Sequence, residues 1–178
     1  FQRVSREITF DGTNTLITKY DYADATGKVT VTAPDGTISY SITNAMGEVT
    51  RRHDQGGDIL YTYNALGKPV KIETNGSVTE IKYDEVGRQK ELHDPNAGVI
   101  TYEYFADGSL KKQVNANGDI TELEYDIAGR TKIKTLTDKE SGVTIGTSST
   151  EYVYVPTGNG IGQIQNIIKK ENGTTVHT

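Results

Sequence analysis

The sequence contains no cysteine and no tryptophan, and only 1 methionine among its 178 residues. Without cysteine the chain has no disulfides and no thiolate metal sites, and its redox compartment stays open. No apolar run approaches the roughly 20 residues that a helix needs to span a bilayer, so we expect no membrane insertion. The chain begins with neither an initiator methionine nor a signal-peptide pattern, and we expect it to be a segment of a longer protein.

Apolar residues are also scarce, at 34% of the chain, whereas glycine (19) and tyrosine (11) are abundant. Such a composition does not fill a thick core, which is normally rich in Leu, Ile, Val and Phe. A charged fraction of 24% with a net charge of −5 is too mild for disorder, and the acidic balance argues against a nucleic-acid surface. These numbers favour short strands joined by tight turns.

A repeat of 20 to 21 residues runs along the chain. Its marker is a glycine after a tyrosine-rich stretch, and successive markers lie 20, 20, 20, 21 and 21 residues apart: Gly27, Gly47, Gly67, Gly87, Gly108 and Gly129. The last four follow a tyrosine by four residues and another apolar residue by six: Tyr63, Tyr83, Tyr104 and Tyr125, and Tyr61, Ile81, Tyr102 and Leu123. A period of two indicates strands with one apolar face.

The first two repeats deviate by one residue. Tyr20 and Tyr22 precede Gly27 by seven and five residues, and Tyr40 and Ile42 precede Gly47 in the same way. We interpret both as turns that are one residue longer, because a register slip would send every side chain to the other face of the sheet.

A second set of turn signals lies midway between the marker glycines: Asp35-Gly36, Gly56-Gly57, Asn75-Gly76, Ala97-Gly98 and Asn117-Gly118. Asn-Gly and Asp-Gly favour two-residue hairpin turns, in which both residues have positive φ. Each repeat therefore has two turns and two strands of about five or six residues. We predict an all-β fold of serial antiparallel β-hairpins that form one curved, twisted, single-layer sheet, as in a segment of a spiral β-shell.

The rhythm breaks once, before a seventh repeat. Tyr152 and Tyr154 precede Gly158 by six and four residues, but Gly158 lies 29 residues after Gly129. The extra residues fall within 137–150, which we expect to form a protruding hairpin or loop. We predict a single array over residues 1–178, with about seven repeats and both ends cut in mid-pattern.

These repeats resemble the YD-repeat, or RHS-repeat, family, whose units read Y-D-x-x-G-R followed by a strand and a turn. "YDEVGR" (83–88) and "YDIAGR" (125–130) match fully, "YNALGK" (63–68) and "YFADGS" (104–109) match in part, and "YADATGK" (22–28) and "ITNAMGE" (42–48) match weakly. The signature that we expect to shape the array comprises Tyr22, Gly27, Tyr40, Gly47, Tyr61, Tyr63, Gly67, Tyr83, Asp84, Gly87, Arg88, Tyr102, Tyr104, Gly108, Tyr125, Asp126, Gly129, Arg130, Tyr152, Tyr154 and Gly158.

The resemblance implies hairpin ribbons that coil into a hollow shell. In bacterial polymorphic toxins and insecticidal Tc complexes such a shell encloses a toxic C-terminal segment, and in wall-associated proteins and teneurins related repeats belong to surface and adhesion proteins. It also implies a secreted or cell-surface parent protein. The family's D-P-x-G-hydrophobic terminus, beside a self-cleavage site, is lacking, since "DPNAGV" (94–99) occupies an ordinary turn position.

The Tyr-Asp-Arg groups around Asp84 and Asp126 could be read as acid–base pairs, which need two titratable groups that converge on one pocket. We favour turns instead, because an Asp that opens a turn accepts from the backbone two residues on, and the glycine supplies the left-handed conformation. Arg88 and Arg130, with Lys28 and Lys68, could bind an anion, but we expect pairing with acidic residues across strands. We expect the tyrosines to pack on neighbouring strands rather than to bind sugars.

Other sites lack their motifs. There is no calcium-binding loop, His53, His93 and His177 are scattered, "GNGIG" (158–162) is not a phosphate loop, and no G-x-S-x-G elbow occurs. We therefore expect no catalytic residue, cofactor or metal.

We predict a structural segment whose partners are the remaining repeats of its parent chain and an encapsulated polypeptide, and whose open sheet edges allow self-association. The alternative is a surface-binding module for a glycan or a protein. A third hypothesis, a glycoside hydrolase, needs a pair of carboxylates that nothing in the sequence singles out.

Overall fold

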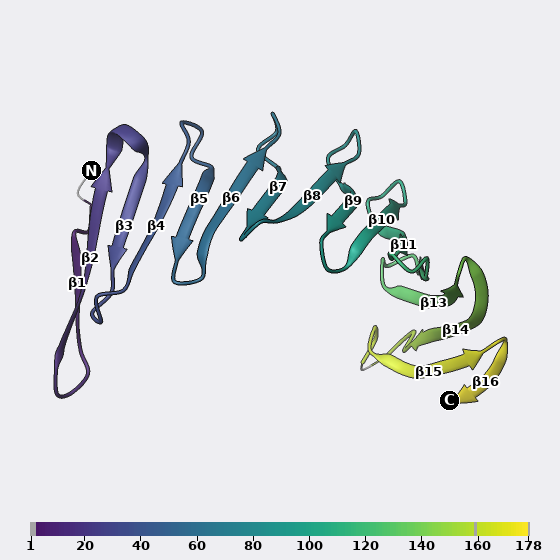
Figure 1. Cartoon of the computed structure of the whole chain (residues 1–178). Coiled ribbons are helices and arrows are strands. Elements are labelled where there is room, and N and C mark those ends of the chain that lie inside the picture. Colours follow the sequence, from purple (N-terminus) through teal and green to yellow (C-terminus); the bar gives the residue numbers. More distant parts are fainter. Residues whose placement is uncertain (1–2, 159, 178) are drawn as a thin grey trace. The chain divides into compact units, whose positions relative to one another are not determined.

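The computed structural model describes residues 3–158 and 160–177 and is all-β (Figure 1). It contains a 16-stranded antiparallel sheet in which each strand is hydrogen-bonded to the strands that precede and follow it in the chain. The strands are β1 (Arg6–Phe10), β2 (Thr15–Ala23), β3 (Lys28–Thr32), β4 (Ile38–Thr43), β5 (Val49–Asp54), β6 (Gly57–Tyr63), β7 (Pro69–Thr74), β8 (Ser77–Tyr83), β9 (Gln89–Asp94), β10 (Gly98–Tyr104), β11 (Leu110–Val114), β12 (Ile120–Tyr125), β13 (Thr131–Glu140), β14 (Val143–Tyr154), β15 (Ile164–Glu171) and β16 (Thr174–His177). The predicted series of antiparallel hairpins is confirmed.

The chain divides into two compact units, Phe1–Ile81 and Lys82–Thr178, and each is described by itself. The first unit contains β1 to β7, the second contains β9 to β16, and β8 crosses the boundary. Over residues 3–158 and 160–177 the structure has no helix of the length and hydropathy that a membrane span requires.

The two faces of the sheet differ in chemistry. In β10 the half-buried residues include Ile100, Tyr102 and Tyr104, and they alternate with the exposed Val99, Thr101 and Glu103. The pairing keeps like with like, since Ile100 lies opposite Leu92 of β9. We call the face that carries Tyr102 and its equivalents the tyrosine face. The predicted period of two is thus confirmed in the strands that end in a tyrosine.

Among the residues that the structure describes, no second layer of secondary structure covers the sheet within either unit. Among the described residues no hydrophobic side chain is buried, and the accessible surface is 12278 Å². A compact globular chain of 19.5 kDa would expose only about 8500 Å². The low apolar fraction of the sequence therefore fits a fold in which no described hydrophobic side chain is buried.

The turns midway between the marker glycines differ in length and in backbone conformation. Asn75 and Gly76 have φ values of 49° and 81°, as a two-residue type I′ turn requires. Asp35-Gly36 and Asn117-Gly118 were expected to match, but only their glycines have positive φ. They belong to three-residue loops, in which the Ala33 N–H donates to the Thr37 carbonyl at 2.8 Å. A type I turn closed by one left-handed glycine needs no second residue with positive φ.

The expectation of a longer turn is confirmed in the first repeat and wrong in the second. Ala23 pairs with Lys28 across four loop residues, of which Asp24–Thr26 form a 3-10 turn. At Gly47, however, the Asn44 N–H donates to the Glu48 carbonyl at 2.9 Å, as Asn64 does to Lys68.

Tyr40 and Ile42 therefore lie on the face opposite to the tyrosine face. Ile42 pairs with Arg51 and Arg51 with Leu60, so all three share the face that alternates with Tyr61. The physical reason is that the turn has the ordinary length, whereas Tyr40 and Ile42 stand one position earlier in the sequence, so Thr43 occupies the position of Tyr63.

The seventh repeat is enlarged at both of its turns. Residues 137–150 lie in a long hairpin, in which β13 has 10 residues and β14 has 12. At the other end, the Val155 N–H donates to the Gln163 carbonyl at 2.9 Å and the Gly162 N–H to the Val155 carbonyl at 3.0 Å. Gly162, rather than the expected Gly158, is therefore the equivalent of Gly129, because this loop is four residues longer.

Two marker glycines form a matched pair for a stability test. Gly27 and Gly47 both have positive φ, at 64° and 84°. A Cβ at Gly27 would clash with the Thr43 carbonyl oxygen, whereas a Cβ at Gly47 would meet nothing within 4 Å. We expect Gly47→Ala to cost roughly 1–2 kcal/mol of left-handed strain, and Gly27→Ala to cost at least about 1 kcal/mol more. Urea unfolding of the two variants measures this difference, and equal losses would contradict the packing at Gly27.

Candidate functional site

The candidate site is the turn that closes each repeat, at residues 44–48, 64–68, 84–88, 105–109 and 126–130; we call these the signature turns. In the turn 84–88, the Asp84 N–H donates to the Arg88 carbonyl at 2.8 Å, and the Gly87 N–H donates back to the Asp84 carbonyl at 2.9 Å. Gly87 has a φ of 83°, a conformation that only glycine adopts at little cost. The same two backbone bonds recur in all five turns.

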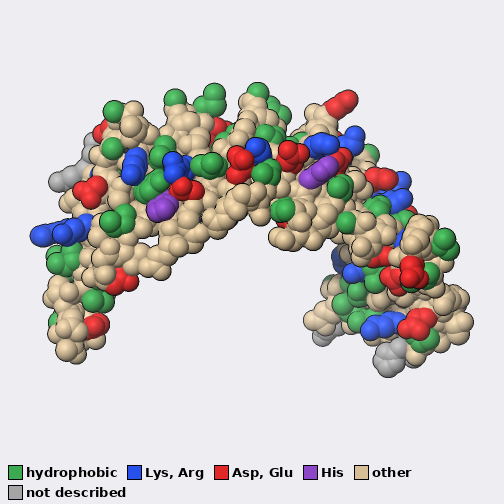
Figure 2. All heavy atoms as spheres, viewed as in Figure 1, with side chains coloured by type: hydrophobic (Ala, Val, Ile, Leu, Met, Phe, Trp, Pro, Cys, Tyr) green, Lys and Arg blue, Asp and Glu red, His purple; other side chains and the backbone are tan. Residues whose placement is uncertain are grey.

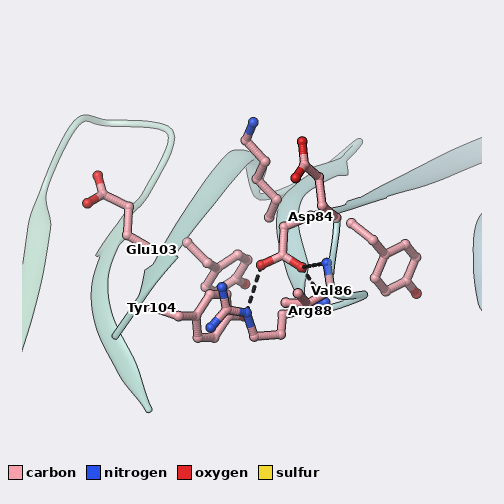
Figure 3. A pocket seen from close by; sticks show the side chains of 9 residues that line it. Asp84, Val86, Arg88, Glu103 and Tyr104 are labelled. Atoms are coloured by element: carbon pink, nitrogen blue, oxygen red, sulfur yellow. Dashed lines mark hydrogen bonds and ion pairs between the residues drawn. The ribbon is translucent and has the colours of Figure 1, made fainter. Parts of the chain in front are cut away.

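The Asp84 carboxylate is engaged within its own turn (Figure 3). Its Oδ1 accepts from the Val86 and Arg88 N–H groups at 3.1 and 2.8 Å, and its Oδ2 accepts from the Arg88 Nε at 2.7 Å. Both oxygens thus serve the turn. The geometry agrees with the turn interpretation of "YDEVGR", because both carboxylate oxygens of Asp84 are bonded within the turn.

Asp126 repeats this arrangement in the turn 126–130. Its Oδ1 accepts from the Ala128 and Arg130 N–H groups at 2.9 and 3.0 Å, and its Oδ2 accepts from the Arg130 Nε at 2.7 Å. The expectation that Arg88 and Arg130 pair with acids across strands is wrong. Each pairs with the aspartate four residues earlier, because the turn folds the first residue of the return strand back beside the residue that opens it.

These contacts lower the pKa of both carboxyl groups. At Asp84, burial acts to raise the pKa, but the hydrogen bonds from the Arg88 backbone and guanidinium outweigh it and the net shift is downward. At Asp126 the guanidinium of Arg130 is the largest cause of a lowered pKa, and its backbone N–H adds to it. Both groups stay ionised, which suits a hydrogen-bond acceptor and not a proton donor.

Two of the loops that an asparagine opens end in an acidic residue four positions later. Asn44 Oδ1 accepts from the Met46 and Glu48 N–H groups at 3.0 Å each, and its Nδ2 donates to Glu48 Oε2 at 2.7 Å. The turn at Asn115 is closed in the same way by Asp119, with Nδ2 to Oδ2 at 2.9 Å. Asp84 and Asp126 are thus matched with arginine, and Asn44 and Asn115 with an acid, whereas Asn64 is followed by Lys68. Sequence reasoning missed the four matched pairs, although the residue types at these two positions display them.

Tyrosine hydroxyls join successive repeats. In each case the hydroxyl of the tyrosine at the end of a repeat donates to a backbone carbonyl oxygen of the repeat before it. The acceptor is the first residue after the preceding signature turn, at 2.7 to 2.9 Å: Tyr63 to Val49, Tyr104 to Gln89, Tyr125 to Leu110 and Tyr154 to Thr131. The sequence predicted that these rings pack on neighbouring strands. The sequence did not predict the hydrogen bond from the tyrosine hydroxyl, because its acceptor is a backbone carbonyl group.

Cations stack on the same rings. The Arg88 guanidinium lies 4.8 Å from the Tyr104 ring centre and its Nη1 donates to the Phe105 carbonyl at 3.0 Å, so it bridges two signature turns. Arg130 lies 4.2 Å from the ring centre of Tyr154. The turns 84–88 and 126–130 are thereby each linked to the tyrosine of the following repeat.

One open hollow lies on the second unit at the turn 84–88, with a volume of about 590 Å³. Its lining residues are Tyr83, Asp84, Glu85, Val86, Arg88, Lys90, Tyr102, Glu103 and Tyr104. Figure 3 shows Glu103 directed away from the Asp84–Arg88 pair. The hollow offers tyrosine rings and cations, but its central carboxylate is already bonded within the turn.

A second polar cluster lies on the first unit, on the face opposite to the tyrosine face. Asp58 accepts from Arg51 Nε at 3.1 Å and contacts His53 Nδ1 at 2.9 Å, and Tyr40 stacks on His53 with ring centres 4.8 Å apart. The hydrogen bond from Arg51, followed by that from His53, lowers the pKa of Asp58 to about 2. This cluster ties β4, β5 and β6 together. Within residues 3–158 and 160–177 no three His, Asp or Glu side chains are grouped as metal ligands.

Together, the turns and the sheet define a β-hairpin repeat array. A comparison with solved structures matches it to a Photorhabdus luminescens Tc holotoxin pore, a mutant in TccC3, with a TM-score of 0.60 at 15% identity over 97% of this chain and 10% of that chain. At this identity the likeness establishes the fold, and it supports the resemblance to the YD-repeat family.

Two further matches, to the TcdB2-TccC3-Cdc42 and TcdB2-TccC3 structures, have TM-scores of 0.41 and 0.34 at 13% and 14% identity, each over 94% of this chain and 14% of that chain. The chain thus spans only a small part of the proteins that it matches. The sequence matches no protein-family model and no curated protein.

The tyrosine ladder predicts a selective effect of one hydroxyl group. Tyr104→Phe removes the bond to the Gln89 carbonyl and keeps the ring, so we expect a loss of about 0.5–1.5 kcal/mol in local stability. Tyr102→Phe is the matched control, because the Tyr102 hydroxyl makes no hydrogen bond to any residue within 3–158 and 160–177. Amide exchange in β9 and β10 measures both, and equal losses would show that the hydroxyl bond contributes nothing.

The lowered pKa values predict that acid affects signature turns unequally. A carboxyl group whose folded pKa lies below its ordinary 3.8 adds stability above that pH, and this contribution is lost as the pH falls through the lowered value. The amides of Val86 and Ala128, which donate to Asp84 and Asp126, should shift in this range in an NMR titration. The Leu66 amide, which donates to the uncharged Asn64, should not. Identical titration of the three amides would contradict the assignment.

Proposed function

We propose that this chain is a non-catalytic wall segment of an RHS/YD-repeat shell that encloses, and helps to deliver, a C-terminal toxin or effector polypeptide. The observation that carries the proposal is a single-layer sheet, with a half-sheltered tyrosine face and no buried core among the described residues, in a fold shared with a Tc holotoxin chain. A wall needs such a sheet, since it must separate two spaces instead of filling one.

The polarity of the sheet supports this role. The tyrosine face carries aliphatic and aromatic side chains, whereas the opposite face of β12 exposes Glu122 and Glu124. An accessible surface of 12278 Å² leaves far more area open than a compact chain of this size. A sheet face of aliphatic and aromatic side chains that no second layer covers is suited to contact with another polypeptide.

The way in which repeats are joined also suits a wall. Each signature turn is bonded to its neighbours through a tyrosine hydroxyl or an arginine, and no distant part of the chain is required. Arrays with such nearest-neighbour contacts extend by adding repeats. We infer that the remaining repeats of the parent chain and an enclosed polypeptide are the partners, and that the parent is secreted or exposed at the cell surface.

The alternative is a surface-binding module for a glycan or a protein. The hollow beside Tyr83, Tyr102 and Tyr104 favours it, because tyrosine offers an apolar ring with a polar tip to a ligand. A glycan-array screen separates the two functions. Specific binding that is lost in Tyr102→Ala would support the binding module. The absence of binding to any glycan would favour the wall segment.

The wall proposal predicts which face becomes covered. Hydroxyl-radical footprinting should show that Tyr61 and Tyr102 react in this 178-residue segment and are protected in the parent protein. Leu60 and Val99, on the opposite face, are the matched controls and should react in both. Deletion of the C-terminal polypeptide from the parent should restore the reactivity of the tyrosines. Protection of Leu60 and Val99 instead would reverse the assignment, and protection of neither face would overturn the proposal.

A further inference from the structure

The signature turn 105–109 differs from its neighbours at both ends. The turns 84–88 and 126–130 begin with an aspartate and end with an arginine, whereas the turn 105–109 begins with Phe105 and ends with Ser109. It is nevertheless closed in the same way, since the Phe105 N–H donates to the Ser109 carbonyl at 2.9 Å and the Gly108 N–H to the Phe105 carbonyl at 3.0 Å. The fold therefore does not require an arginine in this turn.

The guanidinium of Arg88 shows how this fold holds such a group. Its Nε donates to Asp84 Oδ2 at 2.7 Å, and its Nη1 donates to the Phe105 carbonyl at 3.0 Å. The group also stacks on the next tyrosine ring, 4.8 Å from the ring centre of Tyr104 (Figure 3). A carboxylate, a carbonyl and an aromatic face are the partners that a guanidinium group favours.

One repeat further along, an open hollow of about 400 Å³ takes the place of the guanidinium, and its lining residues are Phe105, Ala106, Asp107, Ser109, Tyr125 and Asp126. Tyr125 is the equivalent of Tyr104, on which Arg88 stacks. Asp126 is the equivalent of Phe105, whose carbonyl accepts from Arg88. Among the described residues no Lys or Arg stacks on Tyr125. The hollow therefore presents the ring and the turn against which a guanidinium lies in the repeat before.

Asp107 makes this hollow negatively charged. The other signature turns have an uncharged residue at this position: Met46, Leu66, Val86 and Ala128. The Asp107 Oδ1 accepts from the Ser109 Oγ and from the Ser109 N–H at 2.6 and 2.9 Å. These two hydrogen bonds lower the pKa of Asp107, so its carboxyl group stays ionised.

The charge of Asp107 has no internal partner, because within the described part of the chain this carboxylate forms no ion pair. Glu91 of the same unit, by contrast, pairs with Lys82 at 2.8 Å, and Figure 2 shows Lys and Arg side chains beside Asp and Glu side chains on the face that it presents. The Lys111 ammonium lies 5.9 Å from the Phe105 ring centre and does not line the hollow. An unpaired carboxylate beside two aromatic rings indicates a cation as the occupant.

We propose that this hollow binds the guanidinium group of an arginine side chain from another polypeptide. The bound group stacks on Tyr125, as Arg88 stacks on Tyr104, and pairs with the carboxylate of Asp107. Arginine is preferred to lysine, because its planar group stacks on a ring and donates in several directions at once. The proposal goes beyond the wall function and does not depend on it. A single side chain in an open hollow binds weakly, with a Kd of about 1 mM or more.

A peptide titration tests the site on the 178-residue chain. The probe is glycyl-arginyl-glycine blocked at both ends, and amide NMR is the measurement. We expect the Ser109 amide to shift and the Arg88 amide to stay in place, because the turn 84–88 already holds its own guanidinium. The same peptide with citrulline, an uncharged analogue of arginine, should bind at least about fivefold more weakly. Equal binding of the two peptides, or no shift of Ser109 up to about 100 mM peptide, overturns the proposal.

Two variants test the assignment of the hollow. Phe105→Asp combined with Ser109→Arg restores the ends of the signature, so the turn should form, fill the hollow from within and lose the arginine peptide. Asp107→Asn should weaken binding about two- to fivefold, and it suits the turn because Asn117 holds the same position in the loop 115–119.

Glu122→Gln, on the opposite face of β12, is the matched control for the loss of one negative charge and should bind as the native chain does. Binding that survives the double substitution, or that falls equally in Asp107→Asn and Glu122→Gln, overturns the proposal.

Discussion

The left-handed glycine of the signature turn is the constraint on which the rest depends, and in four of the five turns an Asp or Asn side chain that opens the turn helps to hold it. At Asp84 one carboxylate oxygen accepts from two backbone N–H groups and the other from Arg88, so the chain reverses within five residues. Because the reversal has a fixed length, the tyrosine before it reaches the start of the neighbouring strand. The Tyr104 hydroxyl then bonds the Gln89 carbonyl and joins one repeat to the next.

A sheet built in this way is stabilised along one dimension. Its turns and tyrosines contact only adjacent repeats, and no described hydrophobic side chain is buried in a shared core. The stability of such an array is approximately a sum over repeats and their interfaces. The same arrangement leaves both faces open, so a chain of this composition folds as an ordered layer with a large accessible surface.

The 20- to 21-residue period allowed the strands, the turns and the hairpin order to be predicted from sequence. Glycine and Asn-Gly pairs favour positive φ and therefore mark turns wherever they recur. Tyr40 was assigned to the wrong face of the sheet, because Thr43 replaces the tyrosine that directly precedes the turn in other repeats. Gly158 was chosen over Gly162 because only the hydrogen bonds reveal a loop with four extra residues. The hydrogen bonds from the tyrosine hydroxyls could not be predicted from sequence, because their acceptors are backbone carbonyl groups, which every residue has. The match of aspartate with arginine, and of Asn44 with Glu48, was readable at a spacing of four.

Native-state amide exchange in rising denaturant tests the central claim, that stability resides in neighbouring repeats and not in one core. The amides of Gly47, Gly67, Gly87, Gly108 and Gly129 each donate within a signature turn and report on it one at a time. The account predicts that these amides are protected and that they open in separate steps, in groups of adjacent repeats. A single step, in which all five amides open with one free energy, would show a global cooperative unit and contradict the account.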